Sequence, residues 1–269
     1  MRISIQRSID GANCFESIME ALANGRFERK REEKIGRIIA GIIGAYLLLI
    51  VIIPLILSTN SIPELSGRAN QFDYATQDDW ASWGNNDNGE NSKIGHDQSL
   101  HGGDFAWSEL NPVAAFVYAF GDLNCHQKHE RSWELNDNQL AMCTRDIGIM
   151  LGVIVGAFIW SRRGLNRWTT RDSFLSIFQD QTIEDFYQND RRLLAMIALC
   201  GIGLMPMAID GFTQLLTSYE STNSIRVITG LSAGLVTGWW FSASFSSRSQ
   251  YFDGPEQVQL PANAKLVVK

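Results

Sequence analysis

The chain has 269 residues, 45% of them hydrophobic, and a formal net charge of −6. Strongly apolar and strongly polar blocks alternate along it, which is typical of a membrane protein rather than of one water-soluble domain. The basic residues gather beside the apolar blocks and the long polar block is acidic, so the composition excludes nucleic-acid binding. Neither a phosphate-binding glycine loop nor a dinucleotide fingerprint occurs in the sequence.

The first predicted membrane helix begins at Ile38 and ends at Leu57, a run of twenty residues without a charge. Because about 20 helical residues cross a hydrocarbon core of about 30 Å, this length predicts a transmembrane helix. Pro54, near its end, is tolerated in a membrane helix. The run is too long and begins too late for a cleaved signal peptide, so we expect residues 38–58 to be an uncleaved anchor.

Residues 1–37 are expected to form a cytoplasmic segment with one amphipathic helix, in which Phe15, Ile18, Met19 and Leu22 share a face. Six basic residues then crowd the entrance to the anchor, and positive charge beside a span marks its cytoplasmic side. With four spans, the arginines after the second span and before the third also lie inside. Both termini are therefore predicted to be cytoplasmic.

An acidic extracytoplasmic loop is predicted over residues 59–111, because this segment has nine acidic residues against two basic ones and runs of Gly and Asn. Residues 112–245 are expected to form the membrane domain, and residues 246–269 a cytoplasmic tail without regular structure. The membrane domain carries a polar motif loop and three further spans, Ile147–Trp160, Leu193–Leu216 and Ile225–Phe245. The predicted fold class is an all-α integral membrane protein with about four transmembrane helices and a polar extracytoplasmic loop, located as a multi-pass protein in the cell (plasma) membrane.

Two further features concern the membrane domain. One helix is predicted in the loop between the second and third spans, starting near Asp172. Small residues at every fourth position let helix backbones approach closely in lipid. The second and fourth spans carry such stripes of glycine, and we expect the stripes to hold the helices together: Gly148, Gly152 and Gly156, and Gly230, Gly234 and Gly238.

The motif loop, NCHQKHERSWELNDNQLAMCTRD over residues 124–146, contains two of the four cysteines and two of the four histidines. If the helix of the second span begins before them, Cys143 and Asp146 share one helical face. Cys125 and His126 approach from the preceding loop. Thiolate, imidazole and carboxylate are usual zinc donors, and four of them suffice for a tetrahedral site. These four residues are candidate ligands of zinc or another transition metal; otherwise no cofactor is expected.

A disulfide is the competing interpretation of the same cysteines. Two cysteines in an extracytoplasmic loop meet an oxidising compartment, where a Cys125–Cys143 bridge would staple the loop. Cys14 is predicted to lie inside and Cys200 in the third span, so neither needs a partner. A third option is a pair of unreactive thiols. The residues alone leave these alternatives open.

Asp210 lies inside the third predicted span, where ionisable groups are costly and usually serve a site. Gln214 follows one turn later on the same face. The alternative is structural: Asp210 pairs with an arginine on the same side of the membrane. The candidates for that pairing are Arg131, Arg145 and Arg226.

The stretch CHQKHERSWELNDNQLAMCTRDIGIMLG resembles the hallmark of an uncharacterised prokaryotic integral membrane protein family, a domain of unknown function. The family pattern combines Cys-His-Gln, Arg-Ser and Cys-x-Arg-Cys with later Asp-Gly, Ser-Thr-Asn, Arg and Thr-Gly motifs, and the resemblance covers roughly residues 113–240. Its last motif cysteine is Asp146 here, which can bind zinc but cannot form a disulfide. The resemblance therefore favours a metal site, and it implies no established activity. The matching residues are Cys125, His126, Gln127, Arg131, Ser132, Cys143, Arg145, Pro206, Asp210, Gly211, Gln214, Ser221, Thr222, Asn223, Arg226, Thr229 and Gly230.

Three functions are compatible with these residues, and whether the protein is an enzyme stays open. The first is a metal-dependent enzyme acting on a lipid-like substrate, with Asp210 or His129 as general base. The second is a non-catalytic subunit or assembly factor of a membrane complex, with a structural metal or disulfide and membrane-protein partners besides the lipid bilayer. The third, thiol–disulfide exchange, is the weakest because no Cys-x-x-Cys is present. The predicted substrate-binding residues are Arg131, Arg145, Gln214, Asn223 and Arg226.

Overall fold

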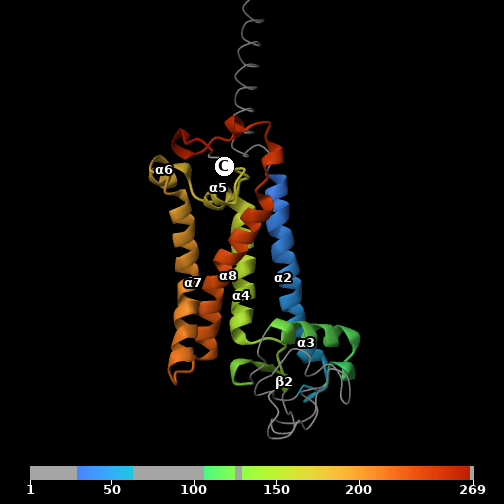
Figure 1. Ribbon diagram of the computed structural model, residues 1–269. Helices are drawn as coiled ribbons and strands as arrows, with labels where there is room; N and C mark the ends of the chain where they lie inside the picture. Colours follow the sequence, from blue (N-terminus) through green and yellow to red (C-terminus); the bar gives the residue numbers. More distant parts are fainter. Residues whose placement is uncertain (1–28, 63–105, 125–128, 267–269) are drawn as a thin grey trace, which may run out of the picture. The chain divides into compact units, whose positions relative to one another are not determined.

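The computed structural model describes residues 29–62, 106–124 and 129–266, which are mostly helical (Figure 1). The all-α class is therefore confirmed. Of the long helices, α2, α4 and α7 are long and apolar enough to cross a membrane. The fourth, α8, has 24 residues at the place of the fourth predicted span, but within the described residues it is not among the candidate spans. The long helices are α2 (Lys30–Ile56), α4 (Thr144–Arg163), α7 (Arg192–Leu216) and α8 (Asn223–Ser246).

Several predicted features lie outside the described residues. These are the amphipathic helix within residues 1–37, most of the acidic loop, and the predicted ligands Cys125 and His126. Within the described part, α2 begins at Lys30 rather than at Ile38, so several of the basic residues before the apolar run are helical.

The motif loop contains a small antiparallel hairpin that the sequence patterns did not predict. Strand β1 (Glu134–Leu135) pairs with β2 (Asn138–Gln139). The two residues between them, Asn136 and Asp137, have φ angles of 56° and 53°. Asn and Asp tolerate this left-handed conformation, which a two-residue hairpin turn of type I′ requires at both positions. The shorter helical elements on either side are η2 (Trp107–Glu109), α3 (Pro112–Asn124) and η3 (His129–Arg131).

Two helices, not one, lie between α4 and α7: α5 (Thr170–Leu175) and α6 (Asp180–Gln188). The side chain of Thr169 caps α5 by accepting a hydrogen bond from the backbone N–H of Asp172 at 3.0 Å. The α5 helix ends at Leu175 and is followed by its C-cap residue Ser176, whose hydroxyl accepts a hydrogen bond from the N–H of Leu165 at 2.8 Å. The hydroxyl residues at both ends therefore limit α5 to less than two turns.

The chain divides into two compact units, each with its own core. The first unit comprises Met1–Gly41, Gly152–Met205 and Ala233–Lys269, and the second comprises Ile42–Leu151 and Pro206–Ser232. In the first unit, the ring of Phe174 stacks on Trp239 with centroids 3.8 Å apart. The second unit has a core in which α2, α3 and the motif loop bury apolar side chains, among them Ile50, Ile53, Val117, Tyr118 and Leu140.

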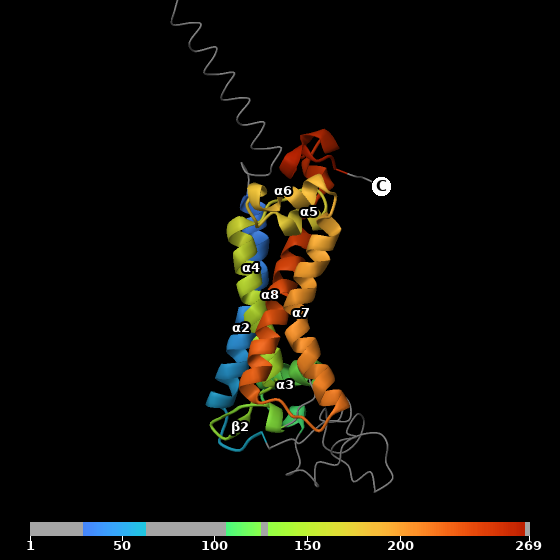
Figure 2. The ribbon, with the colours of Figure 1, turned by 90° about the vertical axis from the view of Figure 1, so that its left-hand side faces the viewer.

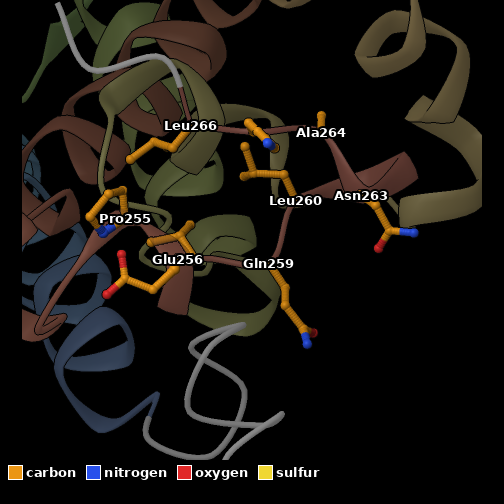
Figure 3. A pocket seen from close by; sticks show the side chains of 9 residues that line it. Pro255, Glu256, Gln259, Leu260, Asn263, Ala264 and Leu266 are labelled. Atoms are coloured by element: carbon orange, nitrogen blue, oxygen red, sulfur yellow. The ribbon is translucent and has the colours of Figure 1, made fainter.

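The tail after α8 is ordered, contrary to our expectation. It forms the short turns η4 (Ser249–Tyr251), η5 (Pro255–Gln257) and η6 (Pro261–Asn263), and α6 contacts η6. Val258 and Leu260 are buried in the core of the first unit, and this apolar burial holds the tail in place. Its side chains line a hollow of about 450 Å³ (Figure 3).

Glycines bring α4 and α8 together, as the two stripes predicted. Figures 1 and 2 show α4 and α8 side by side. At four of the six glycines, an added Cβ would overlap a backbone carbonyl oxygen of the other helix, so only glycine permits this approach. Those glycines are Gly148 and Gly230 in the second unit, and Gly156 and Gly238 in the first.

Side chains bind carbonyl oxygens near both ends of α2. In the first unit, Arg29 donates to the carbonyl oxygens of Ser161 and Gly164, at the end of α4. In the second unit, the Asn138 amide donates to the carbonyl oxygens of Pro54 and Ser58 at 3.1 Å each. These bonds satisfy carbonyl groups that have no partner within a helix.

Candidate functional site

A continuous row of polar side chains runs through the second unit, and we call it the arginine cluster: Arg145, Asp210, Gln214, Arg226, Glu220 and Arg131. Arg145 forms an ion pair with Asp210. The Gln214 amide donates to Asp210 Oδ2 at 2.9 Å, and Arg226 Nη2 donates to Gln214 Oε1 at 2.7 Å. Each member thus binds the next, although they come from several separate segments of the chain.

The far end of the arginine cluster is a carboxylate shared by two guanidinium groups. Arg226 Nη2 lies 3.1 Å from Glu220 Oε2. Arg131 Nη2 lies 3.0 Å and 3.2 Å from the two oxygens of the same carboxylate. Glu220 belongs to the short segment between α7 and α8, whereas Arg131 ends η3. This contact therefore joins the motif loop to the helix pair α7 and α8.

Local structure explains why these side chains meet. Asp210 and Gln214 are one turn apart on α7, and so lie on the same face. Arg145 lies in the first turn of α4, and Arg226 in the first turn of α8. The glycine contacts between α4 and α8 bring these two helix ends close to each other, because Gly230 lies against the Arg145 carbonyl.

Asn223 and Thr144 hold the motif loop against the start of α8. The Thr144 hydroxyl lies 3.0 Å from Asn223 Oδ1 and 3.2 Å from the carbonyl oxygen of Arg131. The Asn223 amide donates to the carbonyl oxygen of Ser132 at 3.4 Å. Asn223, predicted to bind substrate, thus positions the segment that carries Arg131.

Cys143 and Asp146 lie side by side, although α4 begins at Thr144, after Cys143, and not at Leu140 as the helical spacing required. The Cys143 thiol donates to Asp146 Oδ2 at 3.2 Å, and the cysteine is buried. The other two predicted ligands, Cys125 and His126, are outside the described residues. Among the described residues, no group of three His, Cys, Asp or Glu side chains is arranged to hold a metal ion. The structure therefore brings together two of the four predicted ligands and leaves the metal site a prediction.

His129, one of the two predicted general bases, lies beside the hairpin. Its Nδ1 atom is 3.1 Å from Glu134 Oε1, and both side chains are more than a third exposed. The other candidate base, Asp210, is buried and accepts hydrogen bonds from Arg145 and Gln214. The structural alternative for Asp210, pairing with an arginine, is present with Arg145. The catalytic assignments of both residues stay predictions.

Glu220 was missed by the sequence analysis. It directly precedes the Ser-Thr-Asn motif and is the single carboxylate in the turn TSYESTNS. A lone acidic residue in a short exposed turn is most often solvated, so neither its residue type nor its position indicated an ion pair. Its two arginine partners were themselves predicted to bind an anion, and that expectation was the available indication that a nearby carboxylate would pair with them.

The long apolar helices and the polar groups between them define an α-helical integral membrane protein. The model of the family described as "Predicted membrane protein (DUF2085)" matches residues 125–240. An uncharacterized protein of Methanocaldococcus jannaschii, MJ1492, is 32% identical over 133 residues, which cover 49% of this chain and 70% of that protein. An uncharacterized protein of Methanothermobacter thermautotrophicus is 34% identical over 111 residues, which cover 41% of this chain and 78% of that protein.

The chain therefore belongs to the DUF2085 family of predicted membrane proteins, and the resemblance found in the sequence is confirmed. No solved structure gives a significant match. The matched residues include the whole arginine cluster as well as Cys143 and Asp146, whereas α2 lies outside the match.

Proposed function

We propose that this membrane protein is a metal-dependent enzyme, whose metal is held by Cys125, His126, Cys143 and Asp146. We further propose that it acts on a lipid-like substrate and that this site faces the extracytoplasmic side. The observation that supports it is the 3.2 Å separation of Cys143 Sγ and Asp146 Oδ2. Zinc binds sulfur at about 2.3 Å and carboxylate oxygen at about 2.0–2.2 Å, which puts two such donors about 3.5 Å apart in a tetrahedral site. This pair therefore fits one metal ion with little rearrangement.

When three of these four residues bind the ion, its fourth coordination position would hold a water, whose pKa a zinc-type ion would lower towards about 7. The residues of the chain supply the remaining parts. Arg131, Arg145 and Arg226 bind the anionic group of the substrate, because a planar guanidinium matches carboxylate and phosphate oxygens. Gln214 and Asn223 hold these arginines and their backbone in position.

The proton is moved by Asp210 or His129. With its proton on Nδ1, the atom that lies 3.1 Å from Glu134 Oε1, the neutral His129 ring would accept a proton at Nε2. Asp210 already accepts from two donors, so its use as a base requires that Arg145 turns towards the substrate. A single substitution at each position separates the two assignments.

The metal content of the full-length protein, purified in detergent, is the first test. Elemental mass spectrometry should find about one zinc or iron per chain in the wild type and a strong loss in Cys143→Ser and in Asp146→Ala. Cys200→Ser is the matched control, because Cys200 lies in α7, in the other compact unit from Cys143. Absence of metal from wild-type protein purified without chelator, together with an oxidised Cys125–Cys143 pair, would overturn the proposal.

A second candidate function is a non-catalytic subunit or assembly factor of a membrane complex. The ion pair of Asp210 with Arg145 supports it, because this pair links α7 to α4 as a structural element would. The variant Asp210→Asn distinguishes the two. An enzyme should keep its metal and lose a hydrolysis of lipid phosphate esters or acyl esters that the wild type catalyses, whereas a structural subunit should show no such hydrolysis in the wild type and should lose stability in the variant. Thiol–disulfide exchange is distinguished by thiol titration, since it requires Cys125 and Cys143 to cycle between reduced and oxidised states.

A further inference from the structure

We propose that the carboxylate of Glu220 occupies a binding site for a phosphate or phosphomonoester group, and that the ligand binds by displacing it. The inference rests on the proposed function in one respect, namely that the arginine cluster takes the anionic part of the substrate. It adds the class of ligand and an internal competitor that regulates access.

Two arginines converge on the position of the Glu220 carboxylate. Arg131 and Arg226 approach one carboxylate from two segments, with N···O distances between 3.0 Å and 3.2 Å. A phosphate group presents oxygens of the same charge and a similar spacing to guanidinium groups. An anion in place of the Glu220 carboxylate would therefore find both donors already positioned.

The two arginine side chains are more deeply buried than the carboxylate that they bind. The Arg226 side chain is 3% exposed and the Arg131 side chain 24%, whereas that of Glu220 is 63% exposed. Arg226 is also held by Gln214 and by the carbonyl oxygen of Ser221 at 3.1 Å. Glu220 lies in the non-helical segment between α7 and α8, and it pairs with the two arginines. Arg226 and Arg131 are thus held in place by the fold, whereas the Glu220 side chain can move into solvent at a small cost in free energy.

Several buried hydrogen-bond donors at the arginine cluster and beside it have no acceptor in the described part of the chain. Four buried polar atoms at the arginine cluster and directly beside it in the sequence have no hydrogen-bond partner among the described residues: Arg131 Nε, Arg145 Nε, Ser132 Oγ and Ser221 Oγ. Ser132 and Ser221 are each only 7% exposed, and they directly follow Arg131 and Glu220 in the sequence. All four atoms can donate, and buried donors without partners are costly. A ligand with several acceptor oxygens would satisfy them, and a carboxylate has fewer to offer.

The charge of the arginine cluster leads to the same conclusion. Its three arginines face two carboxylates, those of Asp210 and Glu220. When Glu220 leaves, Asp210 alone balances three positive charges. A dianionic phosphate would restore neutrality, while a neutral head group would leave the buried Arg226 without a counter-charge.

Phosphate affinity of the full-length protein in detergent tests the inference, by isothermal titration with inorganic phosphate. If Glu220 occupies the site for about 90% of the time, its removal lowers the apparent dissociation constant by about tenfold. We therefore expect Glu220→Gln to bind phosphate about tenfold more tightly than the wild type does. Glu109→Gln is the matched control, because Glu109 is an exposed carboxylate of the same unit and its loss changes the net charge equally. Equal affinities in the wild type, Glu220→Gln and Glu109→Gln would overturn the proposal.

Two further arms identify the source of the anion and the site. Nanodiscs of phosphatidylcholine with and without phosphatidic acid distinguish a lipid head group from free phosphate. If Glu220→Gln raises the affinity only for phosphatidic acid, the natural ligand is a lipid head group. If it raises the affinity for inorganic phosphate, the natural ligand is the free anion. Adding Arg131→Gln to Glu220→Gln should abolish the gain, and Arg131 is exposed enough for this change to be tolerated.

The outcome is separable from that of the metal proposal. Glu220→Gln leaves Cys143 and Asp146 unchanged, so metal content should equal that of the wild type. Tighter phosphate binding in a metal-free protein would support the displacement and disprove the metal proposal alone. Bound metal together with an unchanged phosphate affinity in Glu220→Gln would support the metal proposal and disprove the displacement alone.

Discussion

Gly156 of α4 lies directly against the carbonyl oxygen of Leu235 in α8, with no room for a side-chain carbon between the two backbones. The variant Gly156→Ala should therefore push the helices apart and lower the free energy of unfolding by about 1–3 kcal/mol. Thermal unfolding in detergent, followed by circular dichroism, measures the change. Gly201→Ala is the control, because a Cβ at Gly201 meets nothing within 4 Å. Equal shifts in both variants would contradict the prediction.

Removing one partner of the ion pair between Arg145 and Asp210 should destabilise the protein more than replacing both partners. Arg145→Met leaves Asp210 buried with a single amide partner, and we expect a loss of stability of about 3–5 kcal/mol. Arg145→Met combined with Asp210→Asn should recover much of that loss. A double-mutant cycle on unfolding in detergent gives the coupling energy. Additive effects of the two substitutions would show that the pair is not coupled.

Arg31 should stabilise the end of α8. Its guanidinium donates to the carbonyl oxygens of Ser246 and Phe245 at 2.5 Å and 2.7 Å, and a cation is favourable at this end of a helix. In Arg31→Gln, the last turn of α8 should exchange its amide hydrogens faster, measured by mass spectrometry of peptides that cover residues 240–248. Arg37→Gln is the control, since Arg37 is exposed and pairs with Glu33 of its own helix. Unchanged exchange in Arg31→Gln would show that the cap contributes little.

Asp190 should make stability depend on pH in the acidic range. A hydrogen bond from Arg192 at 2.7 Å, assisted by its charge, holds the pKa of Asp190 below its ordinary value. Such a group stabilises the fold above the pKa of the unfolded chain, about 3.9, and this contribution is lost as the pH falls through the folded value. Asp190→Asn should therefore be less stable than the wild type at pH 7, with a difference that shrinks below about pH 4. Unfolding curves at both pH values check this, and a constant difference would contradict it.

The long helices could be predicted because each carries a local signal. Apolar runs locate α2, α4 and α7, and the glycine stripes indicate which faces approach. Helix α3 was not predicted, because its sequence, PVAAFVYAFGDLN, is too short for a span. The hairpin turn at Asn136 and Asp137 needed recognition of a two-residue turn inside a polar loop. Short elements of this kind are stabilised by tertiary contacts more than by their own residues.

The sequence predicted which residues make up the site, but it did not predict which of them pair with each other. Asp210, Gln214 and the three arginines were expected to gather, and they do. Which arginine meets Asp210 depends on the approach of α4 and α8, a property of the folded chain. The basic residues before the first span illustrate the same limit. They indicated topology, while the bonds of Arg29 and Arg31 to helix ends depend on contacts across more than a hundred residues.

The bonds near the two ends of α2 have a consequence for how the protein can be shortened. The family match covers residues 125–240, yet Arg29 binds carbonyl oxygens at the end of α4, and Asn138 binds carbonyl oxygens at the end of α2. Gly36 also lies against the carbonyl oxygen of Ala157, a fully buried residue. A fragment limited to residues 125–240 would lose Arg29, the donor to the carbonyl oxygens of Ser161 and Gly164, and would take from the Asn138 amide its acceptors on Pro54 and Ser58. We therefore expect a fragment limited to the family match to be less stable than the whole chain, so that shortening from the N-terminus removes part of the fold.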